Sequence, residues 1–110
     1  MDQPQQKPTQ PDLGAALDRL WTRFQAEIRQ RTAIIDAAVD ALAAGSLSVE
    51  QKDAAASAAH KLAGVLGTFS LARGTELARE LELRFSSAPG SAAELASLVA
   101  ELRTVIDSRG

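Results

Sequence analysis

The sequence predicts an all-α fold, an antiparallel four-helix bundle. Apolar residues recur at intervals of three and four positions in several long segments, as they do on one face of a helix. No segment alternates apolar and polar residues over the length of a strand, and alanine, a strong helix former, is abundant. The connections between the segments are short, which favours antiparallel neighbours. A chain of 110 residues suits one compact domain.

The chain begins with a polar stretch, MDQPQQKPTQP, at residues 1–11. This stretch cannot bury an apolar face, so we expect a flexible N-terminal arm followed by a helical domain over residues 12–110. Arg31 and Thr32 interrupt the apolar stripe that follows, so the first helical segment is either one long helix, a kinked helix or two helices. Gly45 should end it. The stripe consists of Leu13, Leu17, Leu20, Phe24, Ile28, Ile35, Val39 and Leu42.

Capping signals place the other three helices. The pattern Ser48-x-x-Gln51 is a capping box that should start the second helix, which should end within residues 67–70. A third helix is expected over about residues 71–85, followed by a loop over 86–90. A second capping box, Ser91-x-x-Glu94, should open the last helix. The residues expected to face the core are Leu62, Val65, Leu66 and Phe69, then Leu77, Ala78, Leu81 and Phe85, and then Leu95, Leu98, Leu102, Val105 and Ile106.

Composition and charge exclude several functions. The formal net charge is −2 and the two signs are interspersed, so no basic stripe is available to follow a nucleic-acid backbone. Cysteine is absent, which excludes disulfides and thiolate metal sites. No apolar run is long enough to cross a bilayer, and the N-terminus lacks the apolar core of a signal peptide. We therefore expect a cytoplasmic protein that holds no metal or cofactor and binds neither nucleic acid nor membrane.

The only histidine, His60, is predicted to point away from the core. Residues advance by about 100° around a helix, so His60 lies about 200° from Leu62 and about 180° from Phe69, two members of the apolar stripe. A lone histidine is more often structural than functional, but this phase argues against a buried structural role. A metal site is not indicated either, because one histidine with Asp53 seven residues earlier offers too few ligands.

Small side chains surround His60 on its face of the helix. Ala56, Ser57, Gly64 and Gly67 all fall within about 60° of it. Gly64 lies one turn after His60, too early to end the helix, and glycine inside a helix costs about 1 kcal/mol relative to alanine. Such a cost beside an exposed imidazole indicates the close approach of another macromolecule. The alternatives are that Gly67 is only a helix stop and that Gly64 only serves packing.

The residues around His60 resemble the signature of histidine-containing phosphotransfer (HPt) domains. The matching segments are 59–70, AHKLAGVLGTFS, and 77–82, LARELE. They share with the family a histidine, a leucine two residues later, a glycine four residues later, and a following helix with a Leu-Glu pair. The flanking helices fit the family's bundle over about residues 13–107. The resemblance implies that His60 is the phosphorylated residue, that Gly64 gives clearance for docking and that Lys61 is a positive neighbour.

Two positions depart from the family signature. Many members have a lysine three residues after the histidine, where this chain has Ala63, so Lys61 would supply the charge instead. Many also have a glycine ten residues after the histidine, where this chain has Ser70, and this bears on the geometry of the turn. The residues expected to contact a docked receiver domain are Ala56, Ser57, Lys61, Ala63, Gly64 and Gly67.

The resemblance implies a phosphate carrier in a two-component phosphorelay, with no ATP-dependent kinase activity of its own. His60 would accept a phosphoryl group from the aspartate of a response-regulator receiver domain and pass it to another receiver. A hybrid histidine kinase is a further candidate partner. The divalent metal of the reaction would belong to the receiver, and this chain has no phosphate-binding glycine loop. Two alternatives are a helical adaptor that binds receivers without accepting phosphate and a helical oligomerisation domain.

Overall fold

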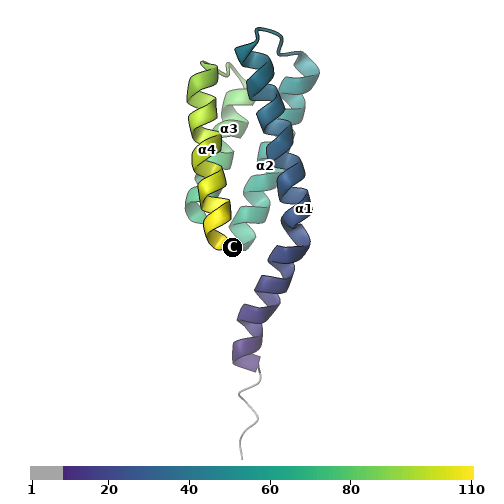
Figure 1. Ribbon diagram of the computed structural model, residues 1–110, viewed down its shortest axis with the longest axis vertical. Helices are drawn as coiled ribbons and strands as arrows, with labels where there is room; N and C mark the ends of the chain where they lie inside the picture. The colour runs from purple at the N-terminus through teal and green to yellow at the C-terminus, as the bar shows by residue number, and fades with distance from the viewer. Residues whose placement is uncertain (1–8) are drawn as a thin grey trace, which may run out of the picture.

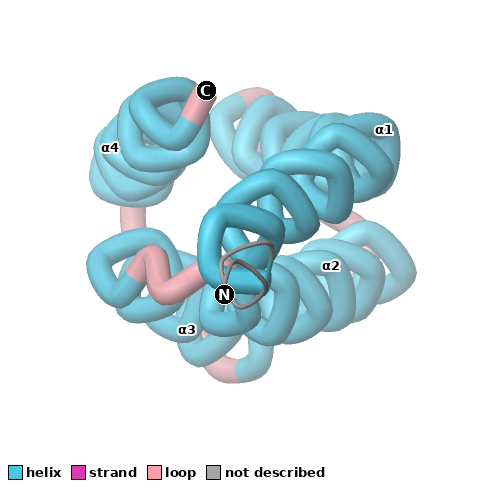
Figure 2. Tube along the Cα trace, turned by 90° about the horizontal axis from the view of Figure 1, so that it is seen from below, coloured by secondary structure: helices cyan, strands magenta, loops and turns pink. Residues whose placement is uncertain are grey.

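The computed structural model describes residues 9–110, which form four helices and no strand. The helices are α1 (Thr9–Ala43), α2 (Val49–Thr68), α3 (Ala72–Ser86) and α4 (Ala92–Arg109). Each helix packs beside the next, and α4 returns to lie beside α1, so that the four helices surround one core (Figures 1 and 2). The predicted all-α four-helix bundle is confirmed.

α1 is one continuous helix of 35 residues, so the alternative of two separate helices is wrong. Thr32 is buried at the interruption of the stripe, and its hydroxyl donates to the carbonyls of Ile28 and Arg29, each at 3.0 Å. These bonds satisfy the hydroxyl without breaking the helix. The helix begins at Thr9, before the predicted end of the arm at residue 11. The proline at position 11 does not prevent this, since proline is tolerated in the first turn of a helix. The rest of the predicted arm, residues 1–8, lies outside the described residues.

The N-terminal part of α1 projects beyond the other three helices (Figure 1). Leu13 is 67% exposed, and between Asp12 and Trp21 the first buried side chain is that of Trp21. The start of the predicted apolar stripe therefore lies outside the core. Trp21 closes this end of the bundle: its ring meets the edge of Phe69 at 4.9 Å between centroids, and the Arg109 guanidinium lies over it at 5.3 Å.

The capping signals place the helix starts correctly. Ser48 accepts a hydrogen bond from the backbone N–H of Gln51, and the Gln51 side chain accepts one from the Ser48 N–H, which completes the box. Ser91 accepts from the N–H of Glu94. The Glu94 carboxylate turns elsewhere and accepts from the Arg84 guanidinium at 3.1 Å. The Ser91-x-x-Glu94 pattern therefore caps α4 through the Ser91 side chain, while the Glu94 side chain pairs with Arg84.

The core confirms most of the predicted apolar stripes. On α3 all four predicted residues are buried, whereas Val65, Leu98 and Val105 are only partly buried. Trp21 and Val99 are buried although the periodicity did not single them out. The fully buried large side chains are Ile28, Ile35, Leu62, Leu66, Leu77, Leu81, Phe85, Leu95 and Leu102.

Close packing of α3 against α2 depends on Gly74. This glycine is buried near the start of α3. A Cβ atom there would lie 3.0 Å from Leu66 Cδ1 on α2 and 3.2 Å from Val105 Cγ1 on α4, closer than packed side chains normally approach. The absence of a side chain at position 74 lets α3 lie directly against α2. This packing brings the far half of α3 beside His60.

Candidate functional site

His60 lies on the outer face of α2, and its side chain is 72% exposed. Leu62 and Leu66, which the helical wheel places on the opposite side, are fully buried. The predicted outward orientation of His60 is therefore confirmed. An imidazole in this position is open to a macromolecule that approaches the bundle from the side.

Glu82 on α3 holds one nitrogen of the His60 ring. The distance between His60 Nδ1 and Glu82 Oε2 is 2.9 Å, and the Glu82 side chain is 32% exposed. A carboxylate can only accept, so the proton of the neutral ring lies on Nδ1 and the lone pair lies on Nε2. The contact therefore selects the tautomer in which Nε2 is the nucleophilic nitrogen.

Glu82 is not among the functional residues predicted from the sequence. It lies 22 residues after His60, on another helix. The available signal was the Leu-Glu pair at the end of the segment that resembles the HPt signature, since Leu81 is fully buried and fixes the rotation of α3. Rotation of the helix by one further residue then turns Glu82 toward the edge of the core.

The predicted docking residues divide between surface and core. Ser57, Lys61, Gly64 and Gly67 are exposed and Ala56 is half-buried, so these five are accessible from the His60 side. Ala63 is 4% exposed and belongs to the hydrophobic core, so its prediction as a docking residue is wrong. Three residues correspond to about 300° around the helix, and this turns Ala63 to a flank that the neighbouring helix covers.

A groove of about 420 Å³ runs between α1 and α2 beside the imidazole. Phe24 and Val65 give it an apolar part, and Glu27, Arg31 and Lys61 give it charge. The residues that line it are Phe24, Glu27, Arg31, His60, Lys61, Gly64, Val65 and Thr68. His60 thus contacts α3 through Nδ1 and borders the groove on the opposite flank, toward α1.

Gly64 forms an open part of this groove. A Cβ atom at this position would meet no atom within 4 Å, so packing inside the chain does not require a glycine. At Gly67 a Cβ would lie 3.8 Å from Thr75 Oγ1, an ordinary contact. The alternative that Gly64 serves packing within the bundle therefore fails. Gly64 is exposed, and the space beside His60 is therefore open on this side.

The Hpt domain family matches residues 19–108 of this chain. The chain belongs to the HPt domain family. A curated relative, Protein RcaC of Microchaete diplosiphon, is 34% identical over 97 residues, which cover 84% of this chain and 15% of that protein. This HPt domain therefore spans a small fraction of that relative's length. No solved structure matches the chain significantly.

The HPt domain keeps the turn after α2 although Ser70 replaces the usual glycine. Ser70 has φ 59°, in the left-handed region. The Ser70 N–H donates to the carbonyl of Gly67 at 3.1 Å, and the Leu71 N–H donates to the carbonyl of Leu66 at 3.0 Å. This is a Schellman ending with a serine at the position that favours glycine. The departure at Ser70 therefore changes the energy of the turn and leaves its geometry intact.

The described part of this HPt domain shows no cluster of three or more His, Cys, Asp or Glu side chains that could hold a metal ion. None of its described helices combines the length and apolar character needed to cross a membrane.

Proposed function

We propose that this chain carries a phosphoryl group on His60 between the receiver domains of a two-component phosphorelay. The observation that carries the proposal is the geometry of His60: the imidazole is exposed, Glu82 holds Nδ1, and Nε2 has no hydrogen-bond partner among residues 9–110. A nucleophile held in one tautomer is ready to attack without first reorganising. The family match supports the same role.

In the proposed reaction, His60 Nε2 attacks the phosphorus of an aspartyl phosphate on the receiver. The N–P bond forms, the P–O bond to the aspartate breaks, and the aspartate leaves as a carboxylate. The Nδ1 proton stays on the ring, which becomes positively charged as the lone pair of Nε2 enters the bond. Attack by the aspartate of a second receiver reverses these changes and returns His60 to the neutral form. No ATP is needed at any step, so we propose a carrier and not a kinase.

Glu82 would lower the energy of this charged ring. Its carboxylate accepts the Nδ1–H at 2.9 Å, and this hydrogen bond strengthens as the imidazole becomes cationic. The interaction is therefore stronger in the transition state than in the free protein, which is the condition for faster transfer. The receiver, with its own divalent metal, would neutralise most of the phosphoryl charge.

The proposed partner surface is the open face around His60. Ser57, Gly64 and Gly67 leave little side-chain bulk beside the imidazole, and no atom of the described residues fills the space over Gly64. Phe24 and Val65 give the adjoining groove an apolar part that a receiver could cover. A receiver docked here would bring its phosphorylated aspartate close to Nε2.

The direct test is transfer of label from receivers phosphorylated with a radioactive small-molecule phosphodonor. The wild-type chain should gain a phosphoryl group that is labile in acid and stable in base, and His60→Gln should gain none while its helical circular dichroism stays unchanged. Transfer to neither protein from any receiver of the same organism, with binding retained, would support the adaptor alternative. Label on the His60→Gln variant would contradict the assignment of the phosphorylated residue.

A second experiment tests the role of Glu82. Glu82→Gln should slow transfer about tenfold, because a charge-assisted hydrogen bond to the ring is replaced by a neutral one. Its affinity for the receiver should stay close to that of the wild type. Glu76→Gln is the matched control, since Glu76 lies on the same helix and pairs with Arg73, away from His60. Equal rates for the wild type and Glu82→Gln would remove Glu82 from the mechanism.

A further inference from the structure

We infer that Arg31 binds the phosphoryl oxygens on phosphorylated His60, and that it exchanges its ion pair with Glu27 to do so. This inference rests on the proposed function. It concerns a residue of α1 that the sequence signature around His60 does not include.

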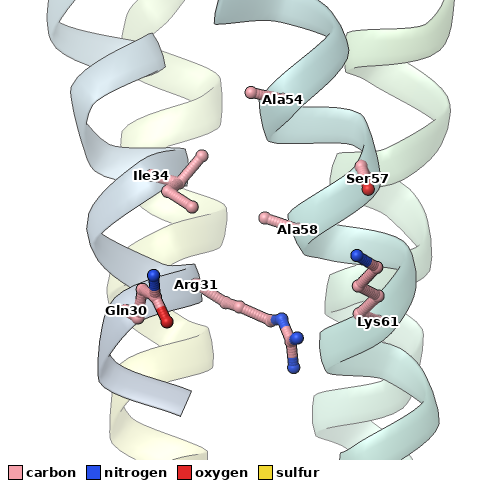
Figure 3. A pocket seen from close by; sticks show the side chains of 7 residues that line it. All are labelled: Gln30, Arg31, Ile34, Ala54, Ser57, Ala58 and Lys61. Atoms are coloured by element: carbon pink, nitrogen blue, oxygen red, sulfur yellow. The ribbon is translucent and has the colours of Figure 1, made fainter. Parts of the chain in front are cut away.

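Two cations border the groove beside His60 in the described part of the chain, Arg31 and Lys61. Both also line a second groove of about 270 Å³ further along the same two helices (Figure 3). In Figure 3 the Lys61 side chain rises along α2 toward Ser57, whereas Arg31 extends from α1 across the gap toward α2. The position three residues after His60, where many family members have lysine, is the buried Ala63. Arg31 is therefore the cation that reaches into the gap from the opposite helix.

Arg31 is held by an ion pair within its own helix. Its side chain is 21% exposed, and among the described residues its hydrogen-bond partner is Glu27, one turn earlier on α1. An ion pair between residues one turn apart on a helix contributes little to stability, because two long side chains must be ordered to form it. Glu27 also borders the groove, at 39% exposure, so its carboxylate lies on the side where a phosphoryl group would appear.

Phosphorylation changes the balance between these groups. The phosphoryl group brings close to two negative charges and three oxygen acceptors to Nε2, more than the single charge of Glu27. The planar guanidinium has five N–H donors, and it can bind two phosphoryl oxygens at once. Arg31 should therefore turn from Glu27 toward the phosphoryl group. The Glu27 carboxylate then competes with the phosphoryl group for Arg31. Arg31 would favour the phosphorylated form, and Glu27 would oppose it.

The experiment measures the equilibrium distribution of label between this chain and one phosphorylated receiver. Arg31→Gln should shift the equilibrium toward the receiver by about tenfold, and Arg31→Lys should recover part of the loss. Glu27→Gln should shift it a few-fold toward this chain, because it releases Arg31. The double variant should behave like Arg31→Gln alone. These opposite directions separate an electrostatic role from a structural one, since loss of the ion pair is common to both single variants.

Arg29→Gln is the matched control, because Arg29 is an exposed arginine of the same helix that lines a different groove, between α1 and α4. It should leave the equilibrium unchanged. An unchanged equilibrium in Arg31→Gln, with His60 still labelled, would overturn the inference and leave the proposed function intact. A shift in Lys61→Gln without one in Arg31→Gln would also overturn it. Absence of label on the wild-type chain would instead contradict the proposed function itself.

Discussion

The two faces of α2 differ in composition. Packing determines the residues of the face turned toward the other helices, whereas the face turned outward carries residues that packing does not require. The inward face consists of buried alanines and leucines, and every one of them is enclosed by neighbouring helices. The outward face carries Ser57, His60, Lys61 and Gly64, all exposed. Packing explains the first set completely. It does not explain the second, which the proposed function attributes to contacts with a partner.

Two glycines show the same difference in a single residue type. A Cβ at Gly74 would lie 3.0 Å from Leu66 Cδ1, whereas a Cβ at Gly64 would meet nothing within 4 Å. Both residues lie inside helices, where glycine is unfavourable. A glycine is needed at position 74 because α3 packs closely against α2 there. Packing places no such requirement on position 64. This contrast separates a glycine that maintains the fold from one to which the proposed function gives a role in contacts with a partner.

The largest expected effect is on the inward face. Leu62 is fully buried two residues after His60, and Leu62→Ala should lower the free energy of unfolding by about 2–5 kcal/mol through lost burial and a cavity. Denaturant unfolding measures this value. Phosphotransfer per folded molecule should change little at low temperature. A loss below about 1 kcal/mol would mean that the core collapses around the cavity and that this face is not tightly packed.

A smaller effect of the same sign is expected for Gly74→Ala. The added methyl group must displace Leu66 or Val105, which should cost about 1–3 kcal/mol despite the higher helix propensity of alanine. Thermal or denaturant unfolding provides the measurement. An increase in stability would show that α3 can move away from α2 without cost, and the comparison between the two glycines would then fail.

The turn at Ser70 tests the boundary between the two helices. Ser70→Gly should raise the free energy of unfolding by up to about 1 kcal/mol, because glycine adopts φ 59° without steric cost. The gain is reduced by the greater freedom of glycine in the unfolded chain. Transfer to His60, ten residues earlier, should scarcely change.

Gly45→Ser provides the matched change in the opposite direction. Gly45 ends α1 at φ 73°, with the same pair of Schellman hydrogen bonds, Gly45 N–H to Leu42 O and Ser46 N–H to Ala41 O. No atom lies within 4 Å of a Cβ built there, so only the backbone conformation is tested. This variant should lose about as much stability as Ser70→Gly gains. Changes of the same sign in both variants would contradict the backbone explanation.

The smallest change in stability, with a large change in function, is expected at Gly64. Gly64→Gln should raise stability by about 0.5 kcal/mol, since glutamine is the better helix former and the space is open. It should nevertheless reduce transfer from a phosphorylated receiver, because the new side chain occupies the docking surface. Unfolding and transfer assays on the same preparation check both values. Equal transfer by Gly64→Gln and the wild type would remove Gly64 from the docking surface.

Local patterns were enough to predict the helices. Ser48 and Gln51 lie three residues apart and form the box that their spacing indicates, and Gly45 ends α1 as expected. Periodicity failed where the partner helix ends: Leu13 belongs to the apolar stripe of α1, yet it lies on the projecting part of the helix and is exposed. A stripe in one helix carries no information about the length of the helices beside it.

The candidate site was predicted only as far as a single helix allows. The phase of His60 relative to Leu62 was sufficient to expect an exposed imidazole. Glu82 and Arg31 come from α3 and α1, and their positions beside His60 depend on how three helices pack together. Ala63 was misplaced for a related reason, since the neighbouring helix covers that flank of α2.

The most direct test of the account is to identify the phosphorylated nitrogen. The chain is phosphorylated by a receiver after uniform ¹⁵N labelling, and the two ring nitrogens of His60 are assigned from long-range proton–nitrogen correlations. Because Glu82 accepts a hydrogen bond from Nδ1, the account predicts phosphorus on Nε2, with Nδ1 still protonated. Phosphorus on Nδ1, or on any residue other than His60, would contradict it.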